Sequence, residues 1–259
     1  MEKTDIKHNW DKMARAYESF TNGKDSYSNL IEWKAIKTII PDLKGKKILD
    51  LGCGTGRFSF LFEELNPSHI IAMDVSEEMI EIGKKIAEEK KFNIQFIQND
   101  IENLSAINSN SIDLIFSSTT LHYIKNLNYV MDEISRILIP GGTCILSVIH
   151  PVYSACYPVS HNNGDFPKDE EWAVKYLDKS IRAYIQPWIE YNPEIENFLS
   201  YSYHHTMSDY INSIVKSGLQ IKELLEPTPP EDWEKSNPGR YYGFIETPTY
   251  AIFRAEKTY

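Results

Sequence analysis

The sequence predicts an α/β fold with a mostly parallel sheet, and two observations lead to this class. Short apolar runs alternate with helical patterns through the middle of the chain, which is typical of strand-helix-strand units. The chain has 259 residues and is 42% hydrophobic, which is enough for one large domain with a substantial core. We therefore expect a single domain that spans residues 1–259.

Seven strands are expected, five in the middle of the chain and two near its end. A helical pattern or a loop separates each apolar run from the next, so the first five strands are expected to be parallel. The expected strands cover residues 46–52, 69–74, 93–100, 112–118, 144–150, 220–226 and 249–256.

Three helices between these strands have clear sequence signals. Ser76 can cap a helix whose first turn carries two glutamates, where negative charge suits the helix dipole. Apolar residues keep helical spacing over 127–138, and the Pro-Gly-Gly at 140–142 is expected to stop that helix. The same spacing returns over 207–215 and predicts a helix before the last two strands.

Two irregular regions interrupt this pattern. Residues 151–203 contain 11 aromatic residues among 53, against 32 of 259 for the chain, which fits a second small core or a lid. Because they follow the fifth strand, at the ligand end of the sheet, we favour a lid over an aromatic or apolar substrate. Residues 227–248 hold five of the thirteen prolines and are expected to form an ordered loop with a function.

Charge and composition exclude several classes of protein. The formal net charge is -10, so there is no excess of Lys and Arg of the kind that binds nucleic acid. No signal peptide or apolar run long enough to span a membrane is visible, and we expect a cytoplasmic protein. The three cysteines, Cys53, Cys144 and Cys156, have no metal-ligand spacing, and neither a metal nor a disulfide is expected.

The stretch ILDLGCGTGRF places Gly52, Gly54 and Gly56 between a strand and a helix. A phosphate-binding P-loop would need Lys and then Ser or Thr after its last glycine, but Arg57 and Phe58 stand there. A dinucleotide fingerprint would need its third glycine one residue later. What remains is a tight turn whose backbone can approach a ligand closely.

Carboxylates at the ends of the next two strands indicate the ligand. Asp74 stands 22 residues after Gly52, where it can accept hydrogen bonds from both hydroxyls of a ribose. Asp100 and Ile101 follow the third strand, where they can contact the edge and the face of an adenine. Together these sites predict an adenosine whose other end is not a pyrophosphate.

These residues belong to five segments that resemble class I S-adenosylmethionine-dependent methyltransferases, in the group that acts on small molecules. The segments are ILDLGCGTG (48–56), AMDVS (72–76), NDI (99–101), IDLIFSSTTLHYI (112–124) and ILIPGGTCILSV (137–148). The resemblance covers about residues 5–150 in order. It implies a Rossmann-like, seven-stranded, mostly parallel sheet with helices on both faces and a lid inserted after the fifth strand.

The resemblance also implies the cofactor, S-adenosylmethionine, with S-adenosylhomocysteine as its product. The glycine turn would hold the methionine part, Asp74 the ribose, and Asp100 with its neighbours the base, while the backbone carbonyl of Ser117 would accept from the amino group. Residues 1–30 resemble helices that cover the cofactor in this group, with Tyr17 facing the site and Trp10 beside it. The implied cofactor-binding residues are Tyr17, Gly52, Cys53, Gly54, Gly56, Asp74, Val75, Met79, Asp100, Ile101 and Ser117.

The expected reaction is a direct in-line displacement that moves the methyl group to a small-molecule acceptor. His122 follows the fourth strand, near the expected position of the methyl group, so it is a candidate base; the alternative is a histidine that only shapes the pocket. His204 is a second candidate. The adjoining His205 stands where one similar bacterial subgroup has Arg, so no role is carried over to it.

Other functions remain open at this point. Nucleic-acid amino methyltransferases have Asn or Asp, then Pro-Pro and an aromatic residue, after the fourth strand, where this chain has Ser-Ser-Thr-Thr. A methyltransferase of RNA or protein, or a regulator that binds the cofactor without turnover, would share much of the pattern. The sequence allows a monomer or a homodimer, and it leaves the acceptor and the methylated atom open.

Overall fold

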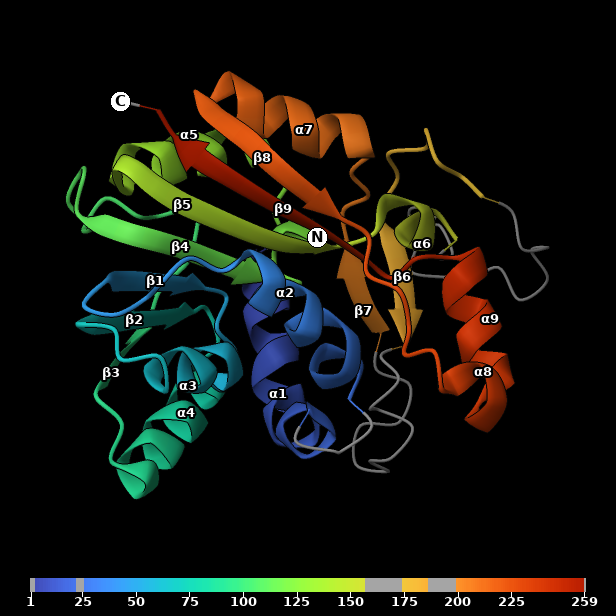
Figure 1. Ribbon diagram of the computed structural model, residues 1–259, viewed down its shortest axis with the longest axis horizontal. Helices are drawn as coiled ribbons and strands as arrows, with labels where there is room; N and C mark the ends of the chain where they lie inside the picture. Colours follow the sequence, from blue (N-terminus) through green and yellow to red (C-terminus); the bar gives the residue numbers. More distant parts are fainter. Residues whose placement is uncertain (1–2, 22–25, 157–173, 186–198, 259) are drawn as a thin grey trace.

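The computed structural model describes residues 3–21, 26–156, 174–185 and 199–258. Its main sheet has seven strands in the order β3-β2-β1-β4-β5-β9-β8 (Figure 1). The first five strands in the chain are parallel, and β9 runs antiparallel between β5 and β8. The strands are β1 (Lys47–Leu51), β2 (His69–Asp74), β3 (Ile94–Gln98), β4 (Ile112–Ser118), β5 (Leu138–Ile149), β8 (Leu219–Leu225) and β9 (Tyr250–Lys257). The predicted fold class is therefore confirmed.

Helices cover both faces of the sheet, because successive side chains of each strand point to opposite faces. On one face Leu49 and Leu51 pack in a core with α5 (Leu127–Ile137) and α7 (Met207–Lys216). On the other face Ile48 packs with α2 (Trp33–Ile39) and α3 (Arg57–Glu63). A smaller cluster joins α3 and α4 (Glu77–Lys90) to β2 and β3.

The expected helix starts and stops are largely confirmed. Ser76 caps α4, since its side chain accepts from the Met79 N–H at 3.2 Å. Helix α5 ends at Ile137, before the Pro-Gly-Gly segment. The expected start of β5 at residue 144 is wrong, because the strand already begins at Leu138. The pairing with β4 shifts register between Ile112 and Leu114, and this irregularity accommodates residues 139–142 of β5.

The proline-rich segment 227–248 also differs from the expected loop. It contains two short helices, α8 (Trp233–Ser236) and α9 (Pro238–Glu246). Pro238 takes the first helical position, where a backbone N–H would have no partner within the helix, so the lack of an N–H in proline costs no hydrogen bond. Phe244 packs edge-on against Tyr27, with ring centroids 4.9 Å apart, and Trp233 lies 6.0 Å from the same ring. The segment therefore supports the N-terminal elements.

Two N-terminal elements lie over the carboxyl end of the parallel strands: helix α1 (Lys3–Thr21) and the π-helical turn η1 (Ser28–Glu32) (Figure 1). The expected lid at 151–203 is described only in part, as α6 (Pro151–Ala155), β6 (Arg182–Ile185) and β7 (Leu199–Ser202). Residues 157–173 and 186–198 of the lid lie outside the described residues. Strands β6 and β7 form a separate antiparallel pair. None of the described helices has the length and apolar character needed to cross a bilayer.

The buried guanidinium of Arg182 organises the described part of the lid. It donates to the backbone carbonyls of Ser154, Lys175, Asp178 and Ser180, at 2.8 to 3.2 Å. Its side chain has no exposed surface. Arg182 therefore ties β6 to α6 and to the turn at residues 175–180.

Candidate active site

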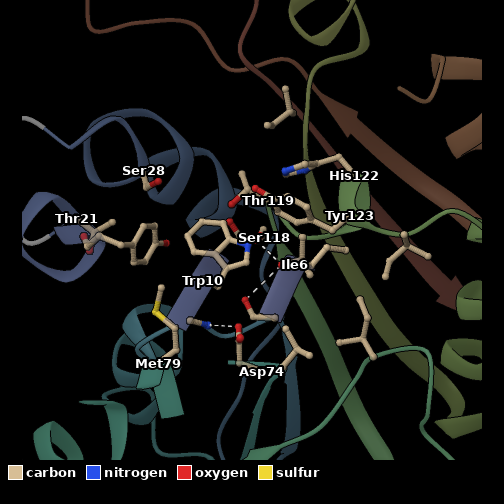
Figure 2. Close-up of a pocket in the computed structure, with 18 of the residues that line it drawn as sticks. Ile6, Trp10, Thr21, Ser28, Asp74, Met79, Ser118, Thr119, His122 and Tyr123 are labelled. Carbon is tan, nitrogen blue, oxygen red and sulfur yellow. Dashed lines mark hydrogen bonds between the residues drawn. The ribbon is translucent and has the colours of Figure 1, made fainter. Parts of the chain in front are cut away.

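A cavity lies at the carboxyl ends of β1, β2 and β4, beneath α1 (Figure 2). Its lining divides into a wall of loops that follow the strands, a roof from the N-terminal helices and a far end near the lid. The strand-end wall contains Gly52, Gly54, Asp74, Val75, Met79, Asp100, Ile101 and Glu102. Seven of these eight residues were predicted from the sequence, and Glu102 was not.

The glycine turn is held in a shape that requires glycine. Gly52, Gly54 and Gly56 all have positive φ angles, of 71°, 56° and 90°. A Cβ atom on Gly52 would stand 2.1 Å from Thr120 Oγ1, so the loop after β4 closes directly on the turn. Thr120 Oγ1 in turn donates to the carbonyl of Ser118 at 2.9 Å.

Asp74 connects the glycine turn to helix α4. Its Oδ2 accepts from the Gly54 N–H at 2.9 Å (Figure 2), and its Oδ1 accepts from the Ser76 N–H, also at 2.9 Å. Burial raises the pKa of Asp74, while the backbone N–H donors act in the opposite direction. Each carboxylate oxygen accepts at two lone pairs, so both can also accept from ligand hydroxyls.

Three predicted cofactor residues stand behind the lining. Cys53 packs with the cluster between α3 and β3, and burial raises the pKa of its thiol well above the usual range. A Cβ atom on Gly56 would stand 2.6 Å from the Phe96 ring, so this glycine allows close packing. Ser117 is fully buried, and its hydroxyl donates to the Leu51 carbonyl at 2.9 Å, which joins β4 to β1. Direct cofactor contacts of these three residues stay predictions.

The roof is aromatic. Figure 2 shows the indole of Trp10 across the middle of the cavity, between Met79 and Tyr123. It packs edge-on against Tyr17 and Tyr123, with centroids 5.6 and 5.8 Å apart. Tyr17 also lines the cavity, and burial raises its pKa to about 12. These rings shield the strand ends from solvent.

A carboxylate holds this roof on the protein. Asp11 Oδ1 accepts from the Ser76 hydroxyl at 2.7 Å and from the Glu78 N–H at 3.3 Å, both at the start of α4. Its other oxygen lies 2.9 Å from Lys7 Nζ. Partial burial opposes ionisation of Asp11, but the hydrogen bonds outweigh it and lower the pKa. Asp11 therefore places negative charge at a helix N-terminus, where it is stabilising.

The far end of the cavity was largely missed from the sequence. It is lined by Ser26, Tyr27, Ser28, Ser118, Thr119, Thr120, His122, Tyr123, Ile124, Ile149, Tyr153, Thr249 and Tyr250. Ser118 ends β4 and residues 119–124 follow it, and all of them lie inside the fourth resembling segment (112–124), where His122 alone among these lining residues was singled out. Tyr27, Ser28, Thr249 and Tyr250 come from distant segments and belong to none of the motifs. Thr119 has a φ of 47°, a strained backbone of the kind that concentrates at functional sites.

His122 lies at this end, on the opposite side of the cavity from Asp74 (Figure 2). Only 3% of its surface is exposed, and its Nδ1 has no hydrogen-bond partner among the described residues. Burial, and then the neighbouring His205, lower its pKa to about 3. The imidazole is therefore neutral at physiological pH and a weak base, better suited to orienting a ligand.

The other predicted histidine lies away from the cavity. His204 Nε2 donates to the Tyr176 carbonyl at 2.8 Å, and its Nδ1 lies 2.9 Å from Ser154 Oγ. Burial lowers its pKa to about 4. His205 Nε2 donates to the Ile124 carbonyl at 2.8 Å, so His204 contacts the lid and His205 contacts the loop after β4. The structure does not bring His204 together with His122.

Known proteins are similar to this chain in sequence and in fold. The chain matches the family described as "Methyltransferase domain" over residues 42–215. It is 33% identical over 207 residues to a demethylmenaquinone methyltransferase of Lactococcus lactis, covering 74% of this chain and 79% of that protein. It is 30% identical over 205 residues to malonyl-[acyl-carrier protein] O-methyltransferase 2 of Ilyobacter polytropus, covering 77% and 66%. The solved structure of an S-adenosylmethionine dependent methyltransferase from Mesorhizobium loti shares the fold, with a TM-score of 0.69, 24% identity and coverage of 87% and 97%.

Proposed function

Because the chain belongs to the family of S-adenosylmethionine-dependent methyltransferases, we propose that it transfers the methyl group to a small molecule bound beside the cofactor. The observation that carries this proposal is a continuous cavity roofed by α1. The glycine turn, Asp74 and Asp100 line one part of it, and hydroxyl and aromatic side chains line the other. An adenosine-binding part and an acceptor-sized part are therefore continuous.

The residues present fit the cofactor. The turn at Gly52 has no room for a side chain, and Asp74 stands at the end of β2 with lone pairs for two hydroxyls. We assign the ribose to Asp74 and the base to Val75, Met79 and the loop at Asp100. Cys53, Gly56 and Ser117 would support the methionine part from behind. When bound, S-adenosylmethionine supplies a methyl group on a sulfonium, which is already electrophilic.

The contribution of the protein is then alignment and exclusion of water. Tyr17 and Trp10 close the roof over the reacting atoms, and the loop after β4 holds the acceptor opposite the sulfur for an in-line displacement. His122 would orient the acceptor through its neutral ring. We assign the lid at 151–203 to the same acceptor, within a single domain over 1–259.

Several further points are proposals of the same kind. The two relatives named above act on different acceptors, so family likeness alone does not select one. The net charge of -10 supports a small molecule over nucleic acid. The three cysteines are free thiols, which supports a cytoplasmic location. A cofactor-binding regulator would lack turnover, and that property separates it from the proposed enzyme.

The test begins with calorimetric titration of the full chain with S-adenosylmethionine, S-adenosylhomocysteine and, as a control, NADH. We expect both sulfur compounds to bind with Kd values on the order of micromolar and NADH not to bind. Incubation with isotopically labelled S-adenosylmethionine and a library of small acceptors should then give a labelled product. Binding of NADH alone would overturn the cofactor assignment, and binding without transfer to any acceptor would favour the regulator.

The roof attachment at Asp11 gives a separate prediction. Replacement of Asp11 by Asn keeps the size of the side chain but removes the charge at the start of α4. We expect S-adenosylhomocysteine to dissociate about fivefold faster, since such a capping interaction contributes roughly 1 kcal/mol. Stopped-flow displacement measures this rate, with Glu89→Gln on the exposed face of α4 as the matched control. Equal rates in the two variants would show that α1 is not held by Asp11.

A further inference from the structure

We propose that Ser118 and Glu32 receive the nucleophilic group of the acceptor and its proton, and that the acceptor is an uncharged or cationic aromatic molecule with an O–H or N–H nucleophile. The inference rests on the proposed function and specifies its substrate class. It follows from a buried carboxyl group that the cofactor-binding residues do not use, and from the charge of the cavity lining.

The geometry of the pair is specific. Ser118 is the last residue of β4 and lines the cavity, and its hydroxyl donates to Glu32 Oε1 at 2.5 Å. Glu32 has no exposed surface, and its Oε2 has no hydrogen-bond partner among the residues that the structure describes. The π-helical turn η1 brings Glu32 to this position, and such irregular turns occur frequently at functional sites.

Glu32 has no ion-pair partner among the residues that the structure describes. The guanidinium of Arg57, just after the glycine turn, donates from Nε and Nη2 to Asn29 Oδ1. Burial raises the pKa of both Tyr17 and Tyr250, and Glu32 adds to the rise in each, so its carboxyl lies close to two residues of the lining. A buried carboxyl with an unused oxygen and no cation is costly to keep for structure alone.

The lining favours one class of acceptor. Around the cavity the described residues include three carboxylates and seven Phe, Tyr or Trp side chains, but no Lys or Arg. The internal segments outside the described residues (22–25, 157–173 and 186–198) contain eight Asp or Glu and only two Lys. Among the described lining residues, a carboxylate or phosphate acceptor would therefore find no counter-charge. The three lining carboxylates lie on the wall assigned to the cofactor, so the carboxyl beside the acceptor is that of Glu32, which together with the aromatic rings suits neutral and cationic molecules.

The proton transfer balances without any further reactant. A lone pair of the acceptor oxygen or nitrogen forms the new bond to the methyl carbon, and the electrons of the carbon–sulfur bond go to sulfur. The proton of the acceptor passes to Ser118 Oγ while the Ser118 proton passes to Glu32 Oε1, which becomes a carboxylic acid. Glu32 thus acts through Ser118 and places negative charge where positive charge develops on the acceptor.

The experiment uses the full chain saturated with S-adenosylhomocysteine, whose binding is first measured in every variant. Three aromatic probes of matched size follow by calorimetry: 2-phenylethylamine, 4-ethylphenol and phenylacetate. We expect the amine and the phenol to bind wild type at least about tenfold more tightly than the acid, a difference of roughly 1.4 kcal/mol. Glu32→Gln should reduce the preference of amine over acid to about threefold or less, and Ser118→Ala should weaken the phenol about fivefold.

Glu223→Gln, on exposed β8, is the matched control and should keep the wild-type preference. Tight binding of phenylacetate to wild type, an unchanged preference in Glu32→Gln, or the absence of binding by all three probes would each overturn the inference. Unchanged binding of the phenol to Ser118→Ala, with its S-adenosylhomocysteine site intact, would remove Ser118 from the assignment. If wild type fails to bind S-adenosylhomocysteine, the proposed function itself has failed, before any probe is added.

Discussion

Replacement of Gly52 by alanine is expected to abolish measurable binding of S-adenosylhomocysteine. The new Cβ would stand 2.1 Å from Thr120 Oγ1 and 2.7 Å from Thr120 Cβ, so rotation of the threonine cannot relieve the contact. The loop after β4 must then move away from the glycine turn, and the two sides of the cavity separate. Overpacking together with the positive φ should lower the free energy of unfolding by about 2 to 4 kcal/mol.

Gly218→Ala is the matched control for this prediction. Gly218 also has a positive φ, of 84°, but nothing lies within 4 Å of a Cβ atom placed there. It should show only the conformational part of the effect, about 1 kcal/mol in the free energy of unfolding, with normal binding. Calorimetry and denaturant unfolding of both variants check the two quantities. Normal S-adenosylhomocysteine binding by Gly52→Ala would mean that the turn does not contact the cofactor.

The sequence predicted the sheet well where apolar runs have sharp ends. Expected and observed limits agree for β2 and β4, because a polar residue or turn follows each run directly. Strand β5 was placed too late, since Pro140 and its two following glycines were interpreted only as a helix stop. The pairing with β4 shifts register, since Ile112 pairs with Leu138 but Leu114 pairs with Thr143. This shift lets the same segment begin a strand, and pairing register cannot be determined from one chain alone.

The two parts of the site also differ in how well they could be predicted from the sequence. Asp74 and Asp100 could be placed because Asp74 is the last residue of β2 and Asp100 comes two residues after the end of β3. The carboxyl ends of parallel strands meet at one edge of the sheet. Tyr250 and Glu32 come from opposite ends of the chain, and only the packing of η1 against β9 and β4 brings them together. No spacing rule predicts a π-helical turn, so the pair formed by Glu32 and Ser118 could not be predicted from the sequence.

Replacement of Asp74 by alanine should raise the Kd for S-adenosylhomocysteine at least about a hundredfold. The change removes the acceptor for the ribose hydroxyls and also leaves the N–H groups of Gly54 and Ser76 without their carboxylate. Charge-assisted hydrogen bonds contribute roughly 1.5 to 3 kcal/mol each. Loss of the ribose contact, or loss of the two bonds to the loop, is therefore sufficient for an effect of this size. Asp74→Asn keeps one acceptor oxygen for the loop and should weaken binding less, by about tenfold.

Asp113→Ala is the control that separates the ribose site from a general loss of strand-end hydrogen bonds. Asp113 Oδ2 also accepts from a backbone N–H, that of Lys47, at 3.0 Å, but at the start of β1 rather than beyond its end. Its replacement should affect unfolding and leave the Kd for S-adenosylhomocysteine within about twofold of wild type. If Asp74→Ala bound the ligand as tightly as Asp113→Ala, the adenosine would have to lie elsewhere. A Kd for S-adenosylhomocysteine that rises in the order wild type, Asp74→Asn, Asp74→Ala would instead show that one carboxylate both holds the loop and binds the ribose.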